Sequence, residues 1–417
     1  MDGGGVALPL TPADSVRLAA HAYSSLLLAT LPLAIAIGGA LACRTACSKV
    51  RSLIWRAATI ALLVVYVGRA QPVQWFAWSL PDRLSTPLVE LGVLQLAVSE
   101  GSSSPSEGLG PGAIATALPF VLIVYWVGVA LFLAPLVRTL LLGPGIARRA
   151  KPLRNPHWEE LLATLRGDIG VRRPIQLLLT SDPVAPRTWG VLRPTILLPL
   201  AVMGWSRQQQ RAVLLHELAH VRRRDPLFLL LSRISCALFW FHPGVWWVAR
   251  ALAAESELSC DACVLAHGVR RSDYAELLLL ASSRFRGLWP LPPAGAALVA
   301  GGGLRDRLMR IVSPEPLDRP VPRRIATLVA SAVLATAPLV SSVQLMPSRR
   351  TLTTLMADSH WASRAYAATG LAQRRDSVDV ARAAAATDPN PRVRAWARFA
   401  LAQPSGRDLL AILSKQH

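Results

Sequence analysis

Long apolar runs separated by basic segments shape the first third of the chain and return near residue 325. The four longest runs cover about 24–43, 53–68, 113–142 and 325–346. A helix needs about 20 apolar residues to cross the roughly 30 Å hydrocarbon core of a bilayer. The first, third and fourth runs have that length, whereas the second, with 16 residues, is marginal. We therefore expect four membrane helices.

The charges between these runs predict how the helices are oriented. The segment between the first two runs carries Arg44, Lys49 and Arg51 and no acidic residue, whereas segment 69–112 carries four acidic and two basic residues. Because short loops rich in Lys and Arg stay in the cytoplasm, we expect the first segment inside and the second outside. Both termini are then expected outside the cytoplasm.

This orientation divides the chain into four expected parts. They are a membrane domain at 1–142 with three transmembrane helices, a cytoplasmic domain at 143–322, a fourth transmembrane helix at 323–346, and an extracytoplasmic tail at 347–417. The fold class is expected to be an α-helical membrane protein with a cytoplasmic α+β domain and a small all-α tail. The stretch 388–401 resembles one HEAT-type helical repeat, and a single repeat cannot bury its own apolar face.

Composition narrows the class of partner. The chain has 45 Lys and Arg residues against 25 Asp and Glu residues, a net charge of +20, and 52% hydrophobic residues. With membrane spans expected, the basic excess indicates cytoplasmic loops beside a lipid bilayer rather than a nucleic-acid surface. Cys260 and Cys263 form a lone CxxC pair without the second pair that a zinc ribbon needs, so we interpret them as small buried residues.

Shorter patterns predict the elements of the cytoplasmic domain. Residues 174–182 read as a strand, and two short β segments around Leu192–Pro194 read as a hairpin. Ser206 and Ser272 are good N-caps, and Pro226 bounds the end of the helix that Ser206 begins. The helices are predicted at 157–167, 206–225, 227–241, 243–268 and 272–285.

The segment LLHELAHVRRRDP, residues 214–226, carries the first candidate chemistry. His216 and His220 are four apart and share a helix face, and Glu217 lies about 100° round the helix. That is the spacing of two zinc ligands and a general base. For the motif alone, a pair of surface histidines is an equal alternative. The apolar neighbours favour a site, because ionisable groups on a buried face need partners.

A catalytic zinc ion needs a third protein ligand, and the segment AAESELSCDACVLAHG offers it. Glu257 and Asp261 are four apart and share a face, whereas Glu255 points about 200° away from Glu257. We assign Glu257 as the third ligand and Asp261 as an acceptor for an N–H of a ligand histidine. A solvated helix face is the alternative. His242 and His267 are expected to cap or pack at helix ends.

Five motifs occur in order along the chain: PRTWGVLRPTILLP (186–199), HELAH (216–220), FWFHPGVWWVAR (239–250), ESELSCDACVL (255–265) and SDYAELLL (272–279). Together they resemble the membrane metallopeptidases related to the β-lactam-sensing transducers of staphylococci. The resemblance extends over roughly residues 20–345.

The resemblance implies a gluzincin-like zinc peptidase domain in a multi-pass protein of the bacterial cytoplasmic membrane. It implies that His216, His220 and Glu257 bind Zn²⁺ and that Glu217 is the general base. A zinc ion would polarise the scissile carbonyl, while Glu217 takes a proton from water and passes it to the leaving amine. The expected substrate is a protein, either a cytoplasmic transcriptional repressor or the chain itself. The β segments at 188–198 could receive it as an added strand.

The chain also departs from that family. The staphylococcal sensors carry an outer domain with a serine three residues before a lysine, and none of the three lysines here has such a serine. Acylation by β-lactams is therefore not expected. Two alternatives remain open: a non-proteolytic, zinc-stabilised membrane signalling scaffold, and a housekeeping membrane peptidase without signal input. We expect Arg222–Arg224 to form a charged helix end, with anionic lipid or an acidic substrate as the alternative contact.

Overall fold

The computed structural model describes residues 12–43, 48–68, 76–79, 111–284, 303–313, 323–341, 343–372, 374 and 377–402. These residues are mostly helical, with a small sheet. The chain divides into two compact units, one of Met1–Leu31, Val64–Val127 and Ala337–His417, and one of Pro32–Leu63 and Gly128–Thr336. Most of the loop predicted outside, 69–112, and the end of the tail lie outside the described residues.

Four long helices cover most of the predicted membrane spans: α1 (Pro12–Ala42), α2 (Ser48–Gly68), α4 (Pro111–Arg149) and α11 (Arg323–Ser341). Among the described residues, two segments are long and apolar enough to cross a membrane, Ser48–Gly68 and Ile123–Leu141. The second run is therefore not marginal, because its helix has 21 residues and begins five residues before Leu53.

The fourth run ends differently from the prediction. Helix α11 ends at Ser341, and Val343–Met346 form strand β6, which pairs in parallel with β1 (Phe76–Ser79). The prediction of one continuous helix to Met346 is therefore wrong at its C-terminal end. An apolar run does not distinguish helix from strand over so few residues, and the pairing partner lies far away in the sequence.

A four-stranded sheet lies in the second unit, with the order β2 (Lys151–Pro152), β3 (Gln176–Thr180), β5 (Thr195–Pro199) and β4 (Arg187–Trp189). Strands β3 and β5 are parallel, whereas β4 is antiparallel to β5. The predicted strand and hairpin are thereby confirmed. Gly190 has a φ of 86°, and an added Cβ would lie 2.4 Å from the Arg193 carbonyl oxygen, so the hairpin requires glycine there.

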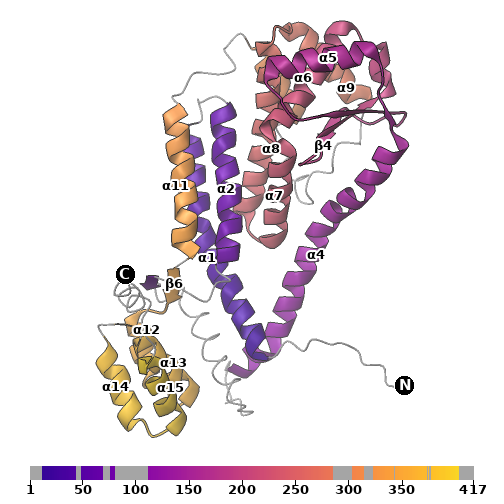
Figure 1. The fold of residues 1–417 in the computed structure, drawn as a ribbon. Helices are drawn as coiled ribbons and strands as arrows, with labels where there is room; N and C mark the ends of the chain where they lie inside the picture. The colour runs from indigo at the N-terminus through magenta and orange to yellow at the C-terminus, as the bar shows by residue number, and fades with distance from the viewer. Residues whose placement is uncertain are drawn as a thin grey trace, which may run out of the picture. The chain divides into compact units, whose positions relative to one another are not determined.

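Helix α6 (Arg207–Arg223) is the central helix of this unit. Ser206 caps it as predicted, in a reciprocal capping box with Gln209. It ends where Arg224 adopts a left-handed conformation with φ 57°. Figure 1 shows it beside α5 (Pro156–Ile169), and it also contacts α8 (Pro243–Ala266), α9 (Arg271–Arg284) and β4. The side chains of Leu214, Leu215 and Leu218 are fully buried in the core.

Four further helices complete the second unit: α7 (Asp225–Leu238), α8 (Pro243–Ala266), α9 (Arg271–Arg284) and α10 (Gly303–Val312). Their positions agree with the predicted helices, and α10 is additional. The predicted cap at Ser272 is wrong, because α9 begins at Arg271 and the Ser272 hydroxyl bonds the Asp273 carboxylate instead. The short helix η1 (Leu200–Gly204) follows β5.

The tail contains two similar helical pairs rather than the single repeat that was predicted. They are α12 (Arg349–Leu355) with α13 (Trp361–Ala372), and α14 (Val378–Thr387) with α15 (Pro391–Ala402). Arg364 donates to the Asp358 carbonyl oxygen at 2.9 Å, and Arg394 donates to the Asp388 carbonyl oxygen at 2.6 Å. Arg364 also bonds the Asp388 carboxylate at 3.0 and 3.2 Å, which joins the two pairs.

Candidate metal centre

Three predicted ligand residues converge where α6 passes α8. The Nε2 atoms of His216 and His220 lie 3.2 Å apart. The Glu257 carboxylate lies 3.5 Å from each of them, with Oε2 toward His216 and Oε1 toward His220. Ligand atoms of a tetrahedral zinc ion, bound at about 2.0–2.1 Å, are about 3.3 Å apart. The three donors therefore have the chemistry and the spacing that such an ion requires.

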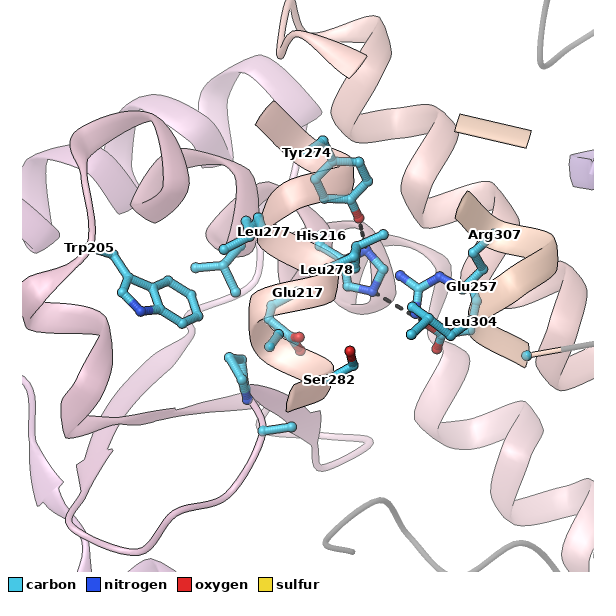
Figure 2. Close-up of a pocket in the computed structure, with 15 residues that line it drawn as sticks. Trp205, His216, Glu217, Glu257, Tyr274, Leu277, Leu278, Ser282, Leu304 and Arg307 are labelled. Atoms are coloured by element: carbon cyan, nitrogen blue, oxygen red, sulfur yellow. Dashed lines mark hydrogen bonds and ion pairs between the residues drawn. The ribbon is translucent and has the colours of Figure 1, made fainter. Parts of the chain in front are cut away.

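Glu217 is held on the other side of the same pocket (Figure 2). Its side chain is buried, and its Oε2 atom accepts a 2.7 Å hydrogen bond from the Thr188 hydroxyl on β4. A pocket of about 330 Å³ is lined by His216, Glu217 and Glu257. The Glu217 carboxylate would thus face the same space as an ion bound between the three donors. A general base and a catalytic metal need this arrangement.

Tyr274 and Asp261 orient His216 through its other ring nitrogen. The Tyr274 oxygen lies 2.9 Å from His216 Nδ1, and its hydroxyl donates to Asp261 Oδ1 at 2.6 Å. Asp261 Oδ1 is itself 3.3 Å from Nδ1. Burial, reinforced by the Asp261 charge, raises the pKa of Tyr274 well above its usual value, so the phenol keeps its proton. Nδ1–H then donates to this pair, and Nε2 faces Glu257.

Arg307, on α10, contacts both Glu257 and Asp261 of α8. It donates to Asp261 at 2.7 and 2.8 Å and contacts Glu257 Oε2 at 2.8 Å. Burial alone would raise the pKa of both carboxyls, but the Arg307 charge and the hydrogen bonds and charge of His216 together outweigh burial and keep both pKa values below their usual range. Sequence analysis missed Arg307, because no motif includes it and only the tertiary fold brings α10 to α8.

The same cluster controls protonation of His216. Burial opposes the charged imidazolium, but hydrogen bonds to Asp261 and Glu257 outweigh burial and raise the pKa of His216 to about 10. In the metal-free protein His216 is therefore protonated at neutral pH. A metal ion that binds at Nε2 has to displace that proton.

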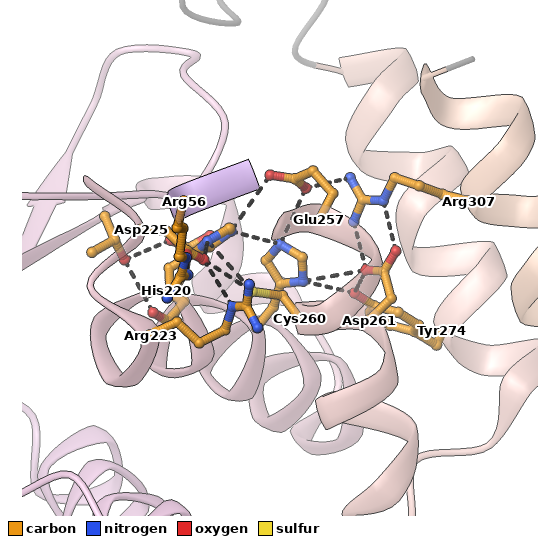
Figure 3. Close-up of polar contacts among 12 residues, drawn as sticks. Arg56, His220, Arg223, Asp225, Glu257, Cys260, Asp261, Tyr274 and Arg307 are labelled. Atoms are coloured by element: carbon orange, nitrogen blue, oxygen red, sulfur yellow. Dashed lines mark hydrogen bonds and ion pairs between the residues drawn. The ribbon is translucent and has the colours of Figure 1, made fainter. Parts of the chain in front are cut away.

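His220 is oriented by a second acidic residue, Asp225, which sequence analysis also missed (Figure 3). Asp225 Oδ2 lies 2.9 Å from His220 Nδ1, and Asp225 also pairs with Arg56 and Arg223. The Cys260 sulfur lies 3.4 Å from the same nitrogen. Burial, together with the Asp225 charge, raises the Cys260 pKa well above its usual value, so the thiol stays protonated. Its neutral state and the two arginines favour an orienting cluster over a second cation site.

The remaining candidates have other partners. Glu255 points away from Glu257, as predicted, and makes two hydrogen bonds with Arg51 at 2.7 and 3.0 Å. His242 caps α8 by accepting from the Gly244 amide, and His267 Nδ1 lies 2.7 Å from the Cys263 carbonyl oxygen.

The three arginines after the motif have different environments. Arg222 is exposed, and Arg224 occupies the left-handed turn between α6 and α7. Arg223 turns inward, bonds Asp225 at 3.2 Å and donates to the Ser52 hydroxyl at 2.8 Å. The expected charged helix end is present, since Arg222 and Arg223 lie in the last turn of α6. Arg223 in addition reaches a buried carboxylate, because the chain reverses at Arg224.

Fold and site together define a mostly helical protein with a small sheet and a candidate metal centre of two histidines and one glutamate. Residues 23–311 match the family described as BlaR1 peptidase M56, and the chain belongs to that family. Regulatory protein BlaR1 of Bacillus licheniformis is 30% identical over 240 residues, which is 55% of this chain and 39% of the relative.

Two more distant relatives match a shorter part of the chain. The methicillin resistance mecR1 proteins of Staphylococcus aureus and Staphylococcus epidermidis are each 27% identical over 95 residues, which is 22% of this chain and 16% of each relative. The matched regions thus span well under half the length of all three relatives.

Proposed function

We propose that this chain is an integral membrane zinc endopeptidase of a signalling pathway in the bacterial cytoplasmic membrane, with its catalytic domain in the cytoplasm. Its proposed substrate is a cytoplasmic regulator, such as a transcriptional repressor, or the chain itself. The observation that carries the proposal is the convergence of His216, His220 and Glu257 beside Glu217 in one pocket. A structural zinc site would not need a general base beside it.

Each residue has a defined role in this proposal. His216, His220 and Glu257 would hold the zinc ion, which supplies Lewis acidity for attack on a peptide carbonyl. Glu217 accepts a proton from the attacking water and returns it to the leaving amine. The Thr188 hydroxyl holds Glu217 Oε2 at 2.7 Å, which leaves Oε1 to face the reacting atoms.

The substrate is proposed to bind as an extended strand. Strand β4 is the last strand of the described sheet and lies beside Glu217 through Thr188, so its open edge could pair with a peptide backbone. One wall of the pocket is apolar and includes Trp205, Val213 and Leu277. We infer that an apolar side chain of the substrate occupies this wall next to the bond to be cleaved.

Support for a regulatory role comes from the relatives. One is named a regulatory protein and two are named methicillin resistance proteins. Because each relative is much longer than its matched region, the signal that this chain receives is not carried over from them. Two apolar segments long enough to span a bilayer support placement in a membrane.

The test compares cells that express the wild-type chain with cells that express Glu217→Gln. Loss of a general base lowers the rate by about 10²–10⁴-fold, so fragments with new N-termini should form only with the wild type. Zinc content should be equal in the two proteins, since Glu217 is not a proposed ligand. Identical fragments from both proteins would refute peptidase activity even if zinc is bound.

A further inference from the structure

Arg56 connects helix α2 to a histidine of the candidate metal centre. Its guanidinium pairs with Asp225 Oδ1, while the other carboxylate oxygen, Oδ2, lies 2.9 Å from His220 Nδ1 (Figure 3). Asp225 is 2% exposed, so its charge depends on these partners rather than on water. The guanidinium carbon of Arg56 also lies 4.4 Å from the centre of the Phe228 ring, which fixes it over α7.

The two oxygens of Asp225 have different partners, and this difference is central to the inference. Arg223 Nε lies 3.2 Å from Oδ2, the same oxygen that faces His220. Without Arg56, Oδ1 would lose this cation, and the carboxylate would be free to rotate away from the orientation that places Oδ2 at His220. Arg56 thus holds Oδ1, which keeps Oδ2 between His220 and Arg223.

The position of α2 along the site is itself fixed. One face of this helix carries polar side chains at helical spacing that contact α6 and α8. These contacts join Ser48 to Ser259, Arg51 to Glu255, and Ser52 to Arg223. Trp55 adds an edge-to-face contact with Trp247, with ring centres 5.3 Å apart.

We propose that Arg56 is a positioning residue for the metal centre: it holds Asp225 so that this carboxylate orients His220 Nε2 toward the metal. The inference rests on the metal centre of the proposed function. Because α2 is apolar and long enough to cross a membrane, the contact connects a candidate membrane helix through Asp225 to a candidate metal ligand. An axial shift of α2 by one residue, about 1.5 Å, would break it.

The test measures zinc affinity of the full-length chain by competition with a chromophoric chelator. Loss of a group that orients a metal ligand weakens metal binding by about 10–100-fold, and we expect this loss in Arg56→Met. The matched control is Arg51→Met, which removes another buried arginine of the same helix, one that bonds the Glu255 carboxylate. It should bind zinc as tightly as the wild type.

A double-mutant comparison separates positioning from general packing. If Arg56 acts through Asp225, then Arg56→Met combined with Asp225→Asn should bind zinc no more weakly than Asp225→Asn alone. The visible spectrum of the cobalt-substituted protein should change in Arg56→Met and not in Arg51→Met. Should the methionine variant not fold, Arg56→Gln keeps the stem and the polarity and is judged by the same criteria.

The outcomes are distinct. Equal zinc affinity in the wild type and Arg56→Met, or equal losses in Arg56→Met and Arg51→Met, would overturn the inference and leave the proposed function intact. A wild-type chain that binds no zinc would overturn both.

Discussion

Two histidines on one helix bind a metal well only if both present a bare nitrogen to it. His216 Nδ1 faces the Tyr274–Asp261 pair, and His220 Nδ1 faces Asp225. Each ring is thereby fixed with Nε2 toward the other histidine and toward Glu257. The protein thus fixes the imidazole orientation before any metal arrives, which reduces the entropy lost on binding.

The raised pKa of His216 predicts proton release when zinc binds. With a pKa of about 10, His216 is protonated at pH 8, and binding at Nε2 displaces that proton. Zinc affinity should therefore fall by about tenfold for each pH unit below 10. Calorimetry at pH 8 in buffers of different ionisation enthalpy should report about one released proton per zinc ion. Affinity that is constant between pH 8 and pH 9 would contradict this.

Individual site residues differed in how far sequence could reveal them. His216, Glu217 and His220 were predicted from one motif. Glu257 and Asp261 were predicted because they are four residues apart on a helix and share a face. Asp225 is only five residues beyond His220, yet no periodicity predicts it, because the chain reverses at Arg224 before α7 begins. Tyr274 and Arg307 reach the site from α9 and α10, and only the tertiary fold brings them there.

At the scale of single elements, helix caps and helical periodicity predicted the bounds of elements better than the apolar runs did. The helices around the site were expected from caps and periodicity, and Ser206 begins α6 as predicted. The end of α11 and the strand β6 were not, because β6 depends on pairing with β1, more than 260 residues earlier in the chain. The first repeat of the tail, α12 with α13, was missed because it has Trp361 where the second repeat has Pro391, the proline that begins α15.

The ion pair between the tail repeats predicts a local loss of stability. Arg364→Met removes two hydrogen bonds to the buried Asp388 carboxylate. We expect this to lower the free energy of local opening of α13 and α15 by about 1–3 kcal/mol. Hydrogen exchange of the full chain measures this. The control is Arg382→Met, whose partner Asp379 is exposed, and it should change opening by less than about 1 kcal/mol. Equal effects would contradict the assignment.

The ion pair between Arg364 and Asp388 also makes the stability of the tail depend on pH. Burial would raise the pKa of Asp388, but the hydrogen bonds from Arg364 lower it below its usual value. A lowered pKa in the folded state stabilises the tail above the unfolded pKa of about 3.9, and this contribution disappears as pH falls through the folded value. Protection of α15 from exchange should therefore decrease below about pH 4, and less so in Arg364→Met.

At the scale of the whole molecule, charge predicts sidedness. The basic segments that flank residues 143–322 predict that this part stays in the cytoplasm and that the tail lies outside. Alkaline phosphatase, which is active only outside the cytoplasm, should be active when fused after Met346 and inactive when fused after Ala150. An inactive fusion after Met346 would place the tail in the cytoplasm and contradict the predicted topology.

Metal content tests the central claim, a zinc centre built from His216, His220 and Glu257. The measurement is zinc bound per full-length chain after dialysis against a weak chelator, in the wild type and in the matched variants Glu257→Gln and Glu255→Gln. We predict about one zinc per chain in the wild type and in Glu255→Gln, and a large loss in Glu257→Gln. Zinc retained in Glu257→Gln and lost in Glu255→Gln would contradict the account.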